Sequence, residues 1–278
     1  MRIAVLQMTS GVDPAANFAT IRDAAAEARE GGADILFTPE MSLLLDRDRQ
    51  RGGEHIVAQD QSPHVPMLRD VAVQNGLFLA LGSMAVALSD GRRANRSMLF
   101  SPSGEEPVTY DKMHMFDVDL ASGESWRESN AYRPGERVVV QAITMARGGG
   151  EETLRLGLAV CYDMRFPALF EALGRRSCDV ISIPAAFTVP TGKAHWHLLL
   201  RARAIEASAY VVAAAQVGEH EDGRRTYGHS LVVDPWGEVL LDMGGEKPGL
   251  GFADIDVGRI AEVRAQLPSL ANRRRIAT

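Results

Sequence analysis

The first forty residues constrain the fold more than any other stretch of the chain. A short apolar run from Ile3 to Met8 is followed by a helical pattern that begins at Asp13-Pro14 and ends at Gly31-Gly32. A second apolar run, residues 33–38, ends in Pro39-Glu40. Short apolar runs bounded by turn residues indicate buried strands, and a strand–helix–strand unit makes its two strands parallel with a right-handed crossover. The chain therefore begins as an α/β protein.

The same alternation continues along the chain without a linker or a short repeat. Turn signals at 89–91 and 235–237 predict hairpins, and Gly148-Gly-Gly predicts a further turn. The pattern predicts one α/β domain over residues 1–278, with helices covering a largely buried sheet. The sequence predicts further strands at 77–81, 95–100, 108–112, 138–143, 153–160, 179–184, 210–215 and 251–255, and helices at 63–76, 166–174, 194–209 and 257–267.

Several segments between these predicted elements lack a clear periodicity of apolar residues. Residues 45–62 form a loop rich in Arg, Asp and Gly, and residues 113–136 form a longer one. A loop this long inside a compact domain is usually functional, so we expect 113–136 to line or cover a ligand site as a lid. We expect the charged turn at His220-Glu-Asp222 and the short C-terminal tail at Arg273-Arg-Arg275 to be solvated.

The composition excludes several classes of protein. A net charge of −6 over 278 residues gives no broad attraction for nucleic acid or for an anionic membrane. Two cysteines form no disulfide framework, which favours a reducing cytoplasm. No apolar segment reaches transmembrane length, and the first apolar run is too short for a signal peptide. We expect a cytoplasmic protein whose partner is a small molecule.

Cys161 stands where an apolar strand changes abruptly into a helical pattern that opens at Phe166-Pro167. A sharp strand–nucleophile–helix turn holds a side chain out of the sheet and directs backbone N–H groups and a helix N-terminus at it. Both features favour a thiolate. The alternative is a small buried apolar residue, which is what we expect for Cys178.

Two more polar residues follow predicted strands. Glu40 ends the second strand and Lys112 ends the strand at 108–112. In open α/β sheets the carboxyl ends of the strands form the edge where ligands bind. Each residue alone has an ordinary alternative: a helix-start carboxylate for Glu40, a surface charge for Lys112, and a solvated loop acid for Glu128.

The residues around these positions make the chain resemble the nitrilase superfamily of carbon–nitrogen hydrolases, and within it the Nit branch. The order and spacing of the motifs agree with that family, and the resemblance covers essentially the whole chain. It implies a four-layer α-β-β-α sandwich that pairs into homodimers or higher homo-oligomers. The matching segments are Phe37-Thr-Pro-Glu40, Tyr110-Asp-Lys112, Val160-Cys161-Tyr-Asp-Met-Arg165, Arg201-Ala-Arg-Ala-Ile-Glu206, Tyr227-Gly-His-Ser230 and Asp234-Pro-Trp-Gly237.

The chemistry of these residues fits amide hydrolysis. An amide is a poor electrophile, so a thiol such as Cys161 needs a nearby base, and no histidine is close to it in sequence. Glu40 can be that base, with a pKa raised by an apolar setting. Lys112 and the backbone N–H of Tyr162 would stabilise the oxyanion. The resemblance makes Glu128 a second, supporting glutamate and implies no cofactor and no metal.

The resemblance also implies a small acidic amide as substrate. Deaminated glutathione, cleaved to α-ketoglutarate and Cys-Gly, is the first candidate. The alternatives are α-ketoglutaramate, as for an ω-amidase, another amide or carbamoyl compound, or a catalytically silent scaffold protein. Arg165 and Lys193 are candidates for binding the substrate carboxylate. Arg165 could equally be structural, and Lys193 stands where relatives often carry proline.

Three other patterns in the chain do not form ligand sites by themselves. His195 and His197 are no metal pair, because residues two apart on a helix face different directions. Thr191-Gly-Lys193 is no phosphate loop, since Phe187 stands where the first glycine is needed. Ser10-Gly-Val-Asp, after the first strand, lacks the glycines of a dinucleotide-binding turn.

Overall fold

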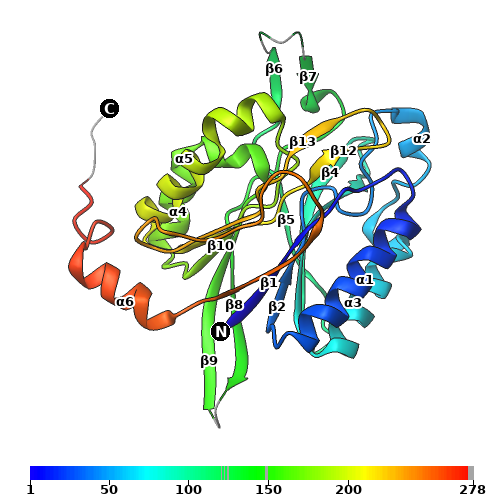
Figure 1. The fold of residues 1–278 in the computed structure, drawn as a ribbon. Coiled ribbons are helices and arrows are strands. Elements are labelled where there is room, and N and C mark those ends of the chain that lie inside the picture. Colours follow the sequence, from blue (N-terminus) through cyan, green and yellow to red (C-terminus); the bar gives the residue numbers. More distant parts are fainter. Residues whose placement is uncertain (120, 122, 124, 148–149, 275–278) are drawn as a thin grey trace.

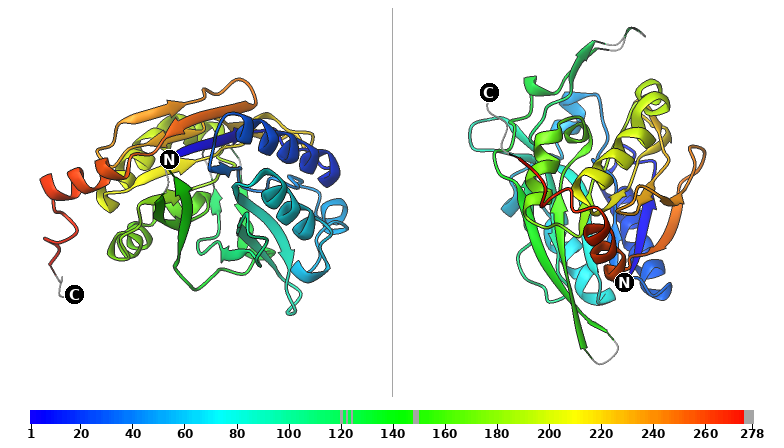
Figure 2. Two further views of the ribbon diagram at one scale, coloured as in Figure 1. Left: turned by 90° about the horizontal axis from the view of Figure 1, so that it is seen from below. Right: turned by 90° about the vertical axis from the view of Figure 1, so that its left-hand side faces the viewer.

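Two six-stranded sheets packed face to face form the centre of the molecule, with helices on both outer sides (Figure 1). The computed structural model describes residues 1–278 except 120, 122, 124, 148–149 and 275–278. The helices α1 (Pro14–Glu30) and α3 (His64–Asn75) pack on the first sheet, and α4 (Pro167–Arg175) and α5 (Val189–Ala207) pack on the second. Two further views show helices on the outer sides of the sheets (Figure 2). The predicted four-layer α-β-β-α sandwich is therefore confirmed.

The strands and helices are named here by their labels in Figure 1. The first sheet contains β16 (Gly249–Asp254), β1 (Arg2–Gln7), β2 (Ile35–Phe37), β3 (Phe78–Ala87), β4 (Arg93–Phe100) and β5 (Val108–Asp111), in that order. The second contains β15 (Val239–Asp242), β14 (Leu231–Val233), β11 (Tyr210–Ala213), β10 (Val180–Ser182), β9 (Gly150–Leu158) and β8 (Val139–Arg147), in that order. The helices are α1 (Pro14–Glu30), α2 (Arg49–Gly53), α3 (His64–Asn75), α4 (Pro167–Arg175), α5 (Val189–Ala207) and α6 (Val257–Gln266).

Shorter elements connect these layers. Two small hairpins pair β6 (Asp117–Asp119) with β7 (Ser125–Arg127) and β12 (Val217–Glu219) with β13 (Arg225–Tyr227). Three single 3₁₀ turns are η1 (Gln59–Gln61), η2 (Glu128–Asn130) and η3 (Cys161–Arg165). None of the helices in the described part of the chain is both long and apolar enough to span a membrane.

The two faces of β1 explain why its sequence is apolar throughout. Ile3 and Val5 belong to the core cluster that also contains Leu156 of the second sheet, so they point between the sheets. Ala4 and Leu6 belong to the cluster that contains residues of α1 and α3. Side chains alternate along a strand, and a strand buried on both faces therefore reads as a continuous apolar run.

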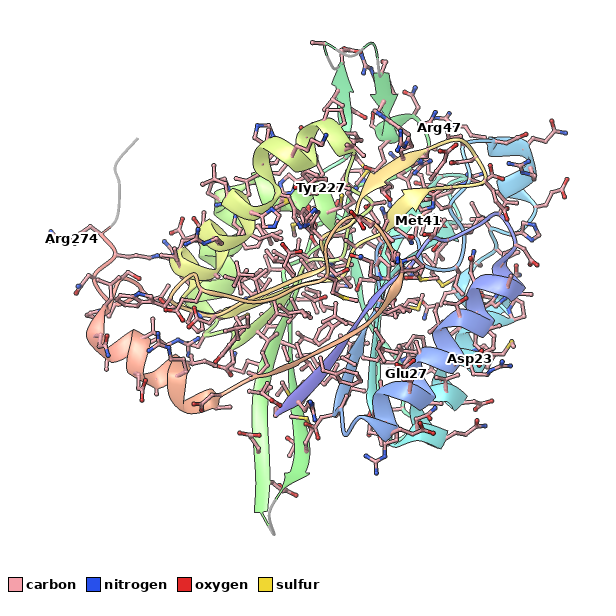
Figure 3. The ribbon with its side chains drawn as sticks, viewed as in Figure 1. Asp23, Glu27, Met41, Arg47, Tyr227 and Arg274 are labelled. Atoms are coloured by element: carbon pink, nitrogen blue, oxygen red, sulfur yellow. The ribbon has the colours of Figure 1, made fainter. Side chains whose placement is uncertain are left out.

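The β-α-β unit forms as the sequence predicts. β1 and β2 pair in parallel, and the Asp13 carboxylate accepts a hydrogen bond from the Ala15 backbone N–H at 2.9 Å, which caps α1. The helix ends at Gly31. Its exposed face carries Asp23 and Glu27, which point away from the sheet (Figure 3).

Some elements differ from the predictions. β3 continues to Ala87 instead of ending near residue 81, because the buried Ser83 hydroxyl accepts a hydrogen bond from the Met41 backbone N–H and so satisfies a polar side chain inside the strand. α5 begins at Val189 instead of 194. The segments 45–62 and 113–136, predicted as loops, contain α2, η1, η2 and the β6–β7 hairpin, and the β12–β13 hairpin was not predicted.

Parts of three predicted segments lie outside the described residues: Gly148-Gly149 of the predicted turn, 120, 122 and 124 of the predicted lid, and Arg275 of the tail. The prediction of a solvated tail is wrong at Arg273. Its guanidinium donates hydrogen bonds to the carbonyls of Glu171 and Glu206 at 3.0 and 3.2 Å, while Arg274 is exposed (Figure 3).

Gly82 allows β3 to approach the chain that leads from β2 to Glu40. A Cβ at this position would lie 2.1 Å from the Thr38 carbonyl oxygen and 2.3 Å from that of Pro39. The Gly82 backbone N–H also donates to the Thr38 hydroxyl at 3.0 Å. The backbone entering the turn at Glu40 is therefore fixed by a contact that only glycine permits.

We expect Gly82→Ala to lower the free energy of unfolding by about 1–3 kcal/mol, because neither backbone can yield to the added methyl group without moving its strand. Urea unfolding followed by circular dichroism measures this change. Gly249→Ala is the matched control, since its Cβ would meet only Met243 at 4.0 Å on an exposed strand end. Equal unfolding midpoints for the two variants would contradict the proposed role of Gly82.

Candidate active site

Glu40, Lys112 and Cys161 meet at one end of the two sheets. Glu40 follows β2 and Lys112 follows β5, both of the first sheet, while Cys161 follows β9 of the second. Their exposed fractions are 5%, 2% and 8%. The side chains that the sequence places after three separate strands therefore share one buried site, and both sheets are needed to form it.

An ion cluster centred on Lys112 organises this site. Its Nζ lies 3.0 Å from Glu40 Oε1 and 2.9 Å from Glu128 Oε2. Asn95 Nδ2 donates to both carboxylates, at 3.0 Å to Glu40 and 3.2 Å to Glu128. The Ala186 backbone N–H donates to the other oxygen of Glu40 at 2.9 Å. The predicted supporting residue Glu128 thus lies in the same cluster, whereas Asn95 belongs to it without any signal in the sequence.

The charge on Glu40 differs from the prediction. Burial acts to raise its pKa, but the Lys112 ammonium and hydrogen bonds from Cys161, Lys112 and the Ala186 N–H outweigh burial, and the pKa is lowered. The prediction of a raised pKa for Glu40 is wrong, because it considered only the apolar end of the strand and not the Lys112 ammonium. Glu40 is a carboxylate that can accept a proton.

The prediction for the thiol of Cys161 is also corrected. Burial and the nearby Glu40 carboxylate raise its pKa well above the usual range, although Lys112 acts in the other direction. α4 begins only at Pro167, after the 3₁₀ turn η3, so its first turn is separated from the cysteine in the chain. The sulfur is therefore a protonated thiol that is hydrogen bonded to the Glu40 carboxylate. The predicted sharp turn at Cys161 is present, since this residue has φ 47°, in the left-handed region.

Asp163 connects the cysteine segment to the lysine segment. Its fully buried carboxylate accepts hydrogen bonds from the Val160 N–H at 2.9 Å and the Tyr110 hydroxyl at 2.7 Å. It also accepts one from the His114 N–H at 3.0 Å. These contacts fix residues on both sides of Lys112 and next to Cys161. Sequence reasoning missed this role, although Asp163 lies inside the cysteine motif.

A cavity of about 730 Å³ opens above the ion cluster. Its lining includes Phe116, Trp126 and Tyr132, from the segment 113–136 that was predicted to line or cover a site, and Phe187 from the second half of the chain. This volume is within the range of pockets that enclose small molecules. Whether 113–136 moves as a lid stays a prediction.

The cavity wall is rich in cations that sequence reasoning missed. The guanidinium groups of Arg47 and Arg224 each lie 4.9 Å from the ring centre of Trp126. Among the residues that the structure describes, neither Arg224 Nε nor Trp126 Nε1, both buried, has a hydrogen-bond partner. The arginines on the wall are Arg47, Arg49, Arg93, Arg127 and Arg224. A buried donor without a partner is costly, and an anionic ligand in the cavity would satisfy these groups.

Arg165 and Lys193 lie outside the cavity lining, so the structure does not support the prediction that they bind the substrate carboxylate. Lys193 is exposed on the second turn of α5. The Arg165 guanidinium lies over the rings of Tyr162 and Phe187, at 5.9 and 5.4 Å from their centres. Tyr162 itself lines the cavity directly after Cys161.

The prediction of a solvated turn at residues 220–222 is wrong for His220, although Glu221 is exposed. His220 is 3% exposed and is hydrogen bonded to the Ser10 carbonyl and the Thr226 hydroxyl. The Val12 N–H donates to the Glu221 carboxylate at 3.1 Å. This docking places the neighbouring Arg224 at the cavity wall. A charged turn read from sequence alone does not reveal that it packs against the first loop of the chain.

Comparison with known proteins shows the family to which the chain belongs. The profile of the carbon-nitrogen hydrolase family matches residues 2–265. A protein of Yersinia enterocolitica named deaminated glutathione amidase is 36% identical over 282 residues, which cover 99% of this chain and 94% of that protein. The chain therefore belongs to the carbon–nitrogen hydrolase family.

Solved structures share the same architecture. The C. elegans NitFhit protein superposes with a TM-score of 0.85 at 33% identity, covering 98% of this chain and 65% of that longer one. A mutant amidase from Nesterenkonia sp. AN1 superposes with a TM-score of 0.75 at 29% identity, covering 96% of this chain and 98% of its own. In that amidase, acrylamide has added to the active-site cysteine.

We expect Lys112→Met to cost about 3–5 kcal/mol of stability at pH 7, because it leaves two carboxylates buried without their cation. Glu40, whose lowered pKa in the wild type stabilises the fold above its ordinary value of 4.5, would then acquire a raised pKa. The deficit of the variant relative to wild type should therefore shrink as the pH falls towards 5.

Chemical denaturation of both proteins at pH 7 and pH 5 measures this difference. Lys193→Met, which removes an exposed lysine outside the cavity, should change stability by less than about 0.5 kcal/mol at either pH. A deficit for Lys112→Met that is the same at both pH values would contradict the ion-cluster interpretation.

Proposed function

We propose that the protein hydrolyses a small acidic amide through a thioester on Cys161. The observation that carries the proposal is the contact of the Cys161 thiol with the Glu40 carboxylate beside Lys112. Since the thiol has a raised pKa and Glu40 a lowered one, the proton stays on sulfur until attack. Sγ then bonds to the carbonyl carbon while its proton passes to Glu40.

The remaining steps reuse the same carboxyl group. Collapse of the tetrahedral intermediate breaks the C–N bond, and Glu40 returns the proton to the leaving amine. A water molecule then attacks the thioester and gives its proton to Glu40. Cleavage of the C–S bond releases the acid, and the sulfur regains the proton. Glu40 is thus base, acid and base again, which a carboxylate in contact with both sulfur and ammonium can perform.

Two donors stabilise the charge that develops on the carbonyl oxygen. We assign them as Lys112 Nζ and the Tyr162 backbone N–H, next to the nucleophile in the chain. Glu128 has a supporting role: its carboxylate holds Lys112 at 2.9 Å and accepts the Phe116 N–H at 2.7 Å. It therefore keeps the ammonium in place while Glu40 loses and regains its charge.

The cavity wall supports an anionic substrate. Arg47 and Arg224 lie over the same Trp126 ring. Burial lowers the pKa of Arg224 and the charge of Arg47 acts in the same direction, while Asp222, whose Oδ2 lies 3.3 Å from an Arg224 guanidinium nitrogen, acts to raise it. Two like charges held near each other in a partly buried wall are stabilised by a carboxylate between or beside them. We infer that these arginines, in place of Arg165 and Lys193, bind the carboxylate of the amide substrate.

We propose deaminated glutathione as the substrate, since it carries a carboxylate beyond the amide on either side and relatives at 36–38% identity bear that name. α-Ketoglutaramate, which has the same acyl half and ammonia as its leaving group, is the second candidate. The cavity of about 730 Å³ has room for the longer molecule.

Release of α-ketoglutarate from the two amides, measured side by side, tests this proposal. We expect faster release, as kcat/KM, from deaminated glutathione than from α-ketoglutaramate. Cys161→Ala should abolish both reactions, and Glu40→Gln should abolish them as well, with no thioester detectable by intact-protein mass spectrometry, because the base for the thiol is lost. The reverse ranking would assign the protein to α-ketoglutaramate, and turnover that survives Cys161→Ala would refute the mechanism.

We expect Arg224→Met to raise KM for the anionic amide about 10- to 100-fold, because the variant loses one charge-assisted hydrogen bond worth about 1.5–3 kcal/mol. Arg47→Met should act in the same direction. KM for a neutral amide such as pentanamide should change little in either variant. Arg165→Met and Lys193→Met are the controls outside the cavity, and an equal rise of KM in all four variants would contradict the assignment.

We further propose that the protein acts in the cytoplasm as a homodimer. Both Cys161 and Cys178 are free thiols, which suits a reducing compartment. Exposed apolar side chains occur on α5 and around the β14–β15 hairpin, where a second copy could cover them: Leu198, Ile205, Trp236, Val239 and Leu240. Size-exclusion chromatography with light scattering measures the oligomeric state.

A further inference from the structure

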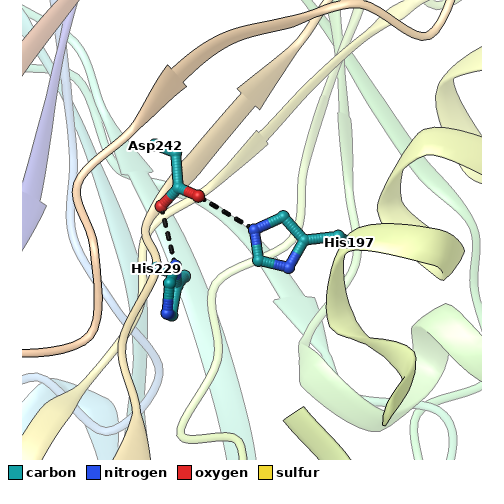
Figure 4. A group of neighbouring side chains, drawn as sticks. All are labelled: His197, His229 and Asp242. Carbon is teal, nitrogen blue, oxygen red and sulfur yellow. Dashed lines mark hydrogen bonds and ion pairs between the residues drawn. The ribbon is translucent and has the colours of Figure 1, made fainter. Parts of the chain in front are cut away.

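Away from the cavity, two histidines and an aspartate converge from three separate elements (Figure 4). His197 lies on α5, His229 precedes β14, and Asp242 ends β15. His197 Nε2 and His229 Nδ1 each lie 2.9 Å from a different oxygen of the Asp242 carboxylate. None of the three lines the catalytic cavity.

The donor atoms of this group are arranged as metal ligands would be. One nitrogen from each imidazole and a carboxylate oxygen all lie within 4.8 Å of one another. Two ligand atoms that each lie about 2.1 Å from a zinc ion are no more than about 4.2 Å apart. A small rotation of a side chain would therefore bring all three donor atoms within the distance that a shared zinc ion requires. His197, 36% exposed at the helix surface, has the freedom to make that rotation.

Two of the ligands are held in place by other contacts. Asp242 accepts the Gly244 N–H at 2.9 Å, which fixes the orientation of its carboxylate. The His229 ring stacks on the Tyr227 ring with 4.4 Å between their centres. The backbone N–H of His229 donates to the Gly244 carbonyl at 2.7 Å. A cation would therefore meet a site that is already largely ordered.

We propose that His197, His229 and Asp242 bind one divalent transition-metal ion, with Zn²⁺ as the ion of best fit. Two imidazole nitrogens with one carboxylate suit zinc or its neighbours, whereas Mg²⁺ and Ca²⁺ prefer oxygen ligands. Each imidazole that now donates its N–H to Asp242 binds the metal through that nitrogen and carries its proton on the other. Water completes the coordination from the solvent side.

The ion would connect α5 to the β14–β15 hairpin. Trp196, next to His197, donates its indole N–H to the His229 carbonyl at 2.8 Å and packs against Phe187, with 5.1 Å between ring centres. Phe187 is part of the cavity wall. Metal binding thus stabilises a helix that supports one side of the active site, and it supplies no step of the reaction.

Cobalt binding to the full-length Cys161→Ala protein tests the proposal, because that background removes the active-site thiol as a competing ligand. We expect one equivalent of Co²⁺ with visible d–d absorption, displacement of Co²⁺ by Zn²⁺, and a Tm that rises with metal concentration. His197→Ala and Asp242→Asn should each weaken binding at least ten-fold. His195→Ala removes a histidine from the same helix outside the group and should bind as the parent does.

The measurement separates a metal site from a hydrogen-bonded triad. If Co²⁺ fails to bind at micromolar concentrations, or binds equally to the His197→Ala and His195→Ala proteins, the proposal is overturned. Thermal unfolding of each variant without metal shows whether it is folded. Should Asp242→Asn unfold, His197→Ala alone decides the result, since its side chain lies at the surface.

Discussion

The buried ammonium of Lys112 is the interaction on which the site depends. It compensates two carboxylates, Glu40 and Glu128, that would otherwise be charged and unpaired in a nearly dry environment. An unpaired buried charge costs several kcal/mol, so each member requires the others. The same cluster sets the protonation of Cys161, because Glu40 is ionised as a result of Lys112 and then holds the thiol proton.

The four-layer fold provides what this cluster needs. Glu40 and Lys112 come from one sheet and Cys161 from the other, so the charges meet only when the two sheets pack. The Asp163 carboxylate connects the lysine and cysteine segments through its hydrogen bonds to Tyr110 and Val160. Gly82 allows β3 to lie close to the backbone that leads to Glu40. The left-handed φ of Cys161 shows that packing imposes a conformation which the residue would not prefer alone.

Much of this could be predicted from sequence, and the failures have a common cause. Most strands of the two large sheets, and the positions of Glu40, Lys112 and Cys161 after strands, follow from apolar periodicity and local motifs and were predicted correctly. The four layers were predicted from the family resemblance. The pKa directions of Glu40 and Cys161 were wrong. Burial and then the Glu40 carboxylate raise the pKa of Cys161, and burial of Glu40 is outweighed by Lys112 and by hydrogen bonds, so both directions depend on packing and on groups from distant segments. Arg165 was chosen because it is close to Cys161 in sequence and Lys193 because it precedes a helix, whereas the arginines that line the cavity include Arg47 and Arg224.

The sequence by itself determined the alternation of strands and helices and the residues that follow each strand, since these depend on periodicity and on neighbours in the chain. The tertiary structure alone decided which side chains share a space. Arg47, Trp126 and Arg224 come from distant parts of the sequence, Arg47 and Arg224 from loops and Trp126 from β7. His197, His229 and Asp242 likewise come from separate segments of the chain. Contacts of this kind arise when two sheets and their loops pack together, and no local pattern in the chain encodes the resulting distances.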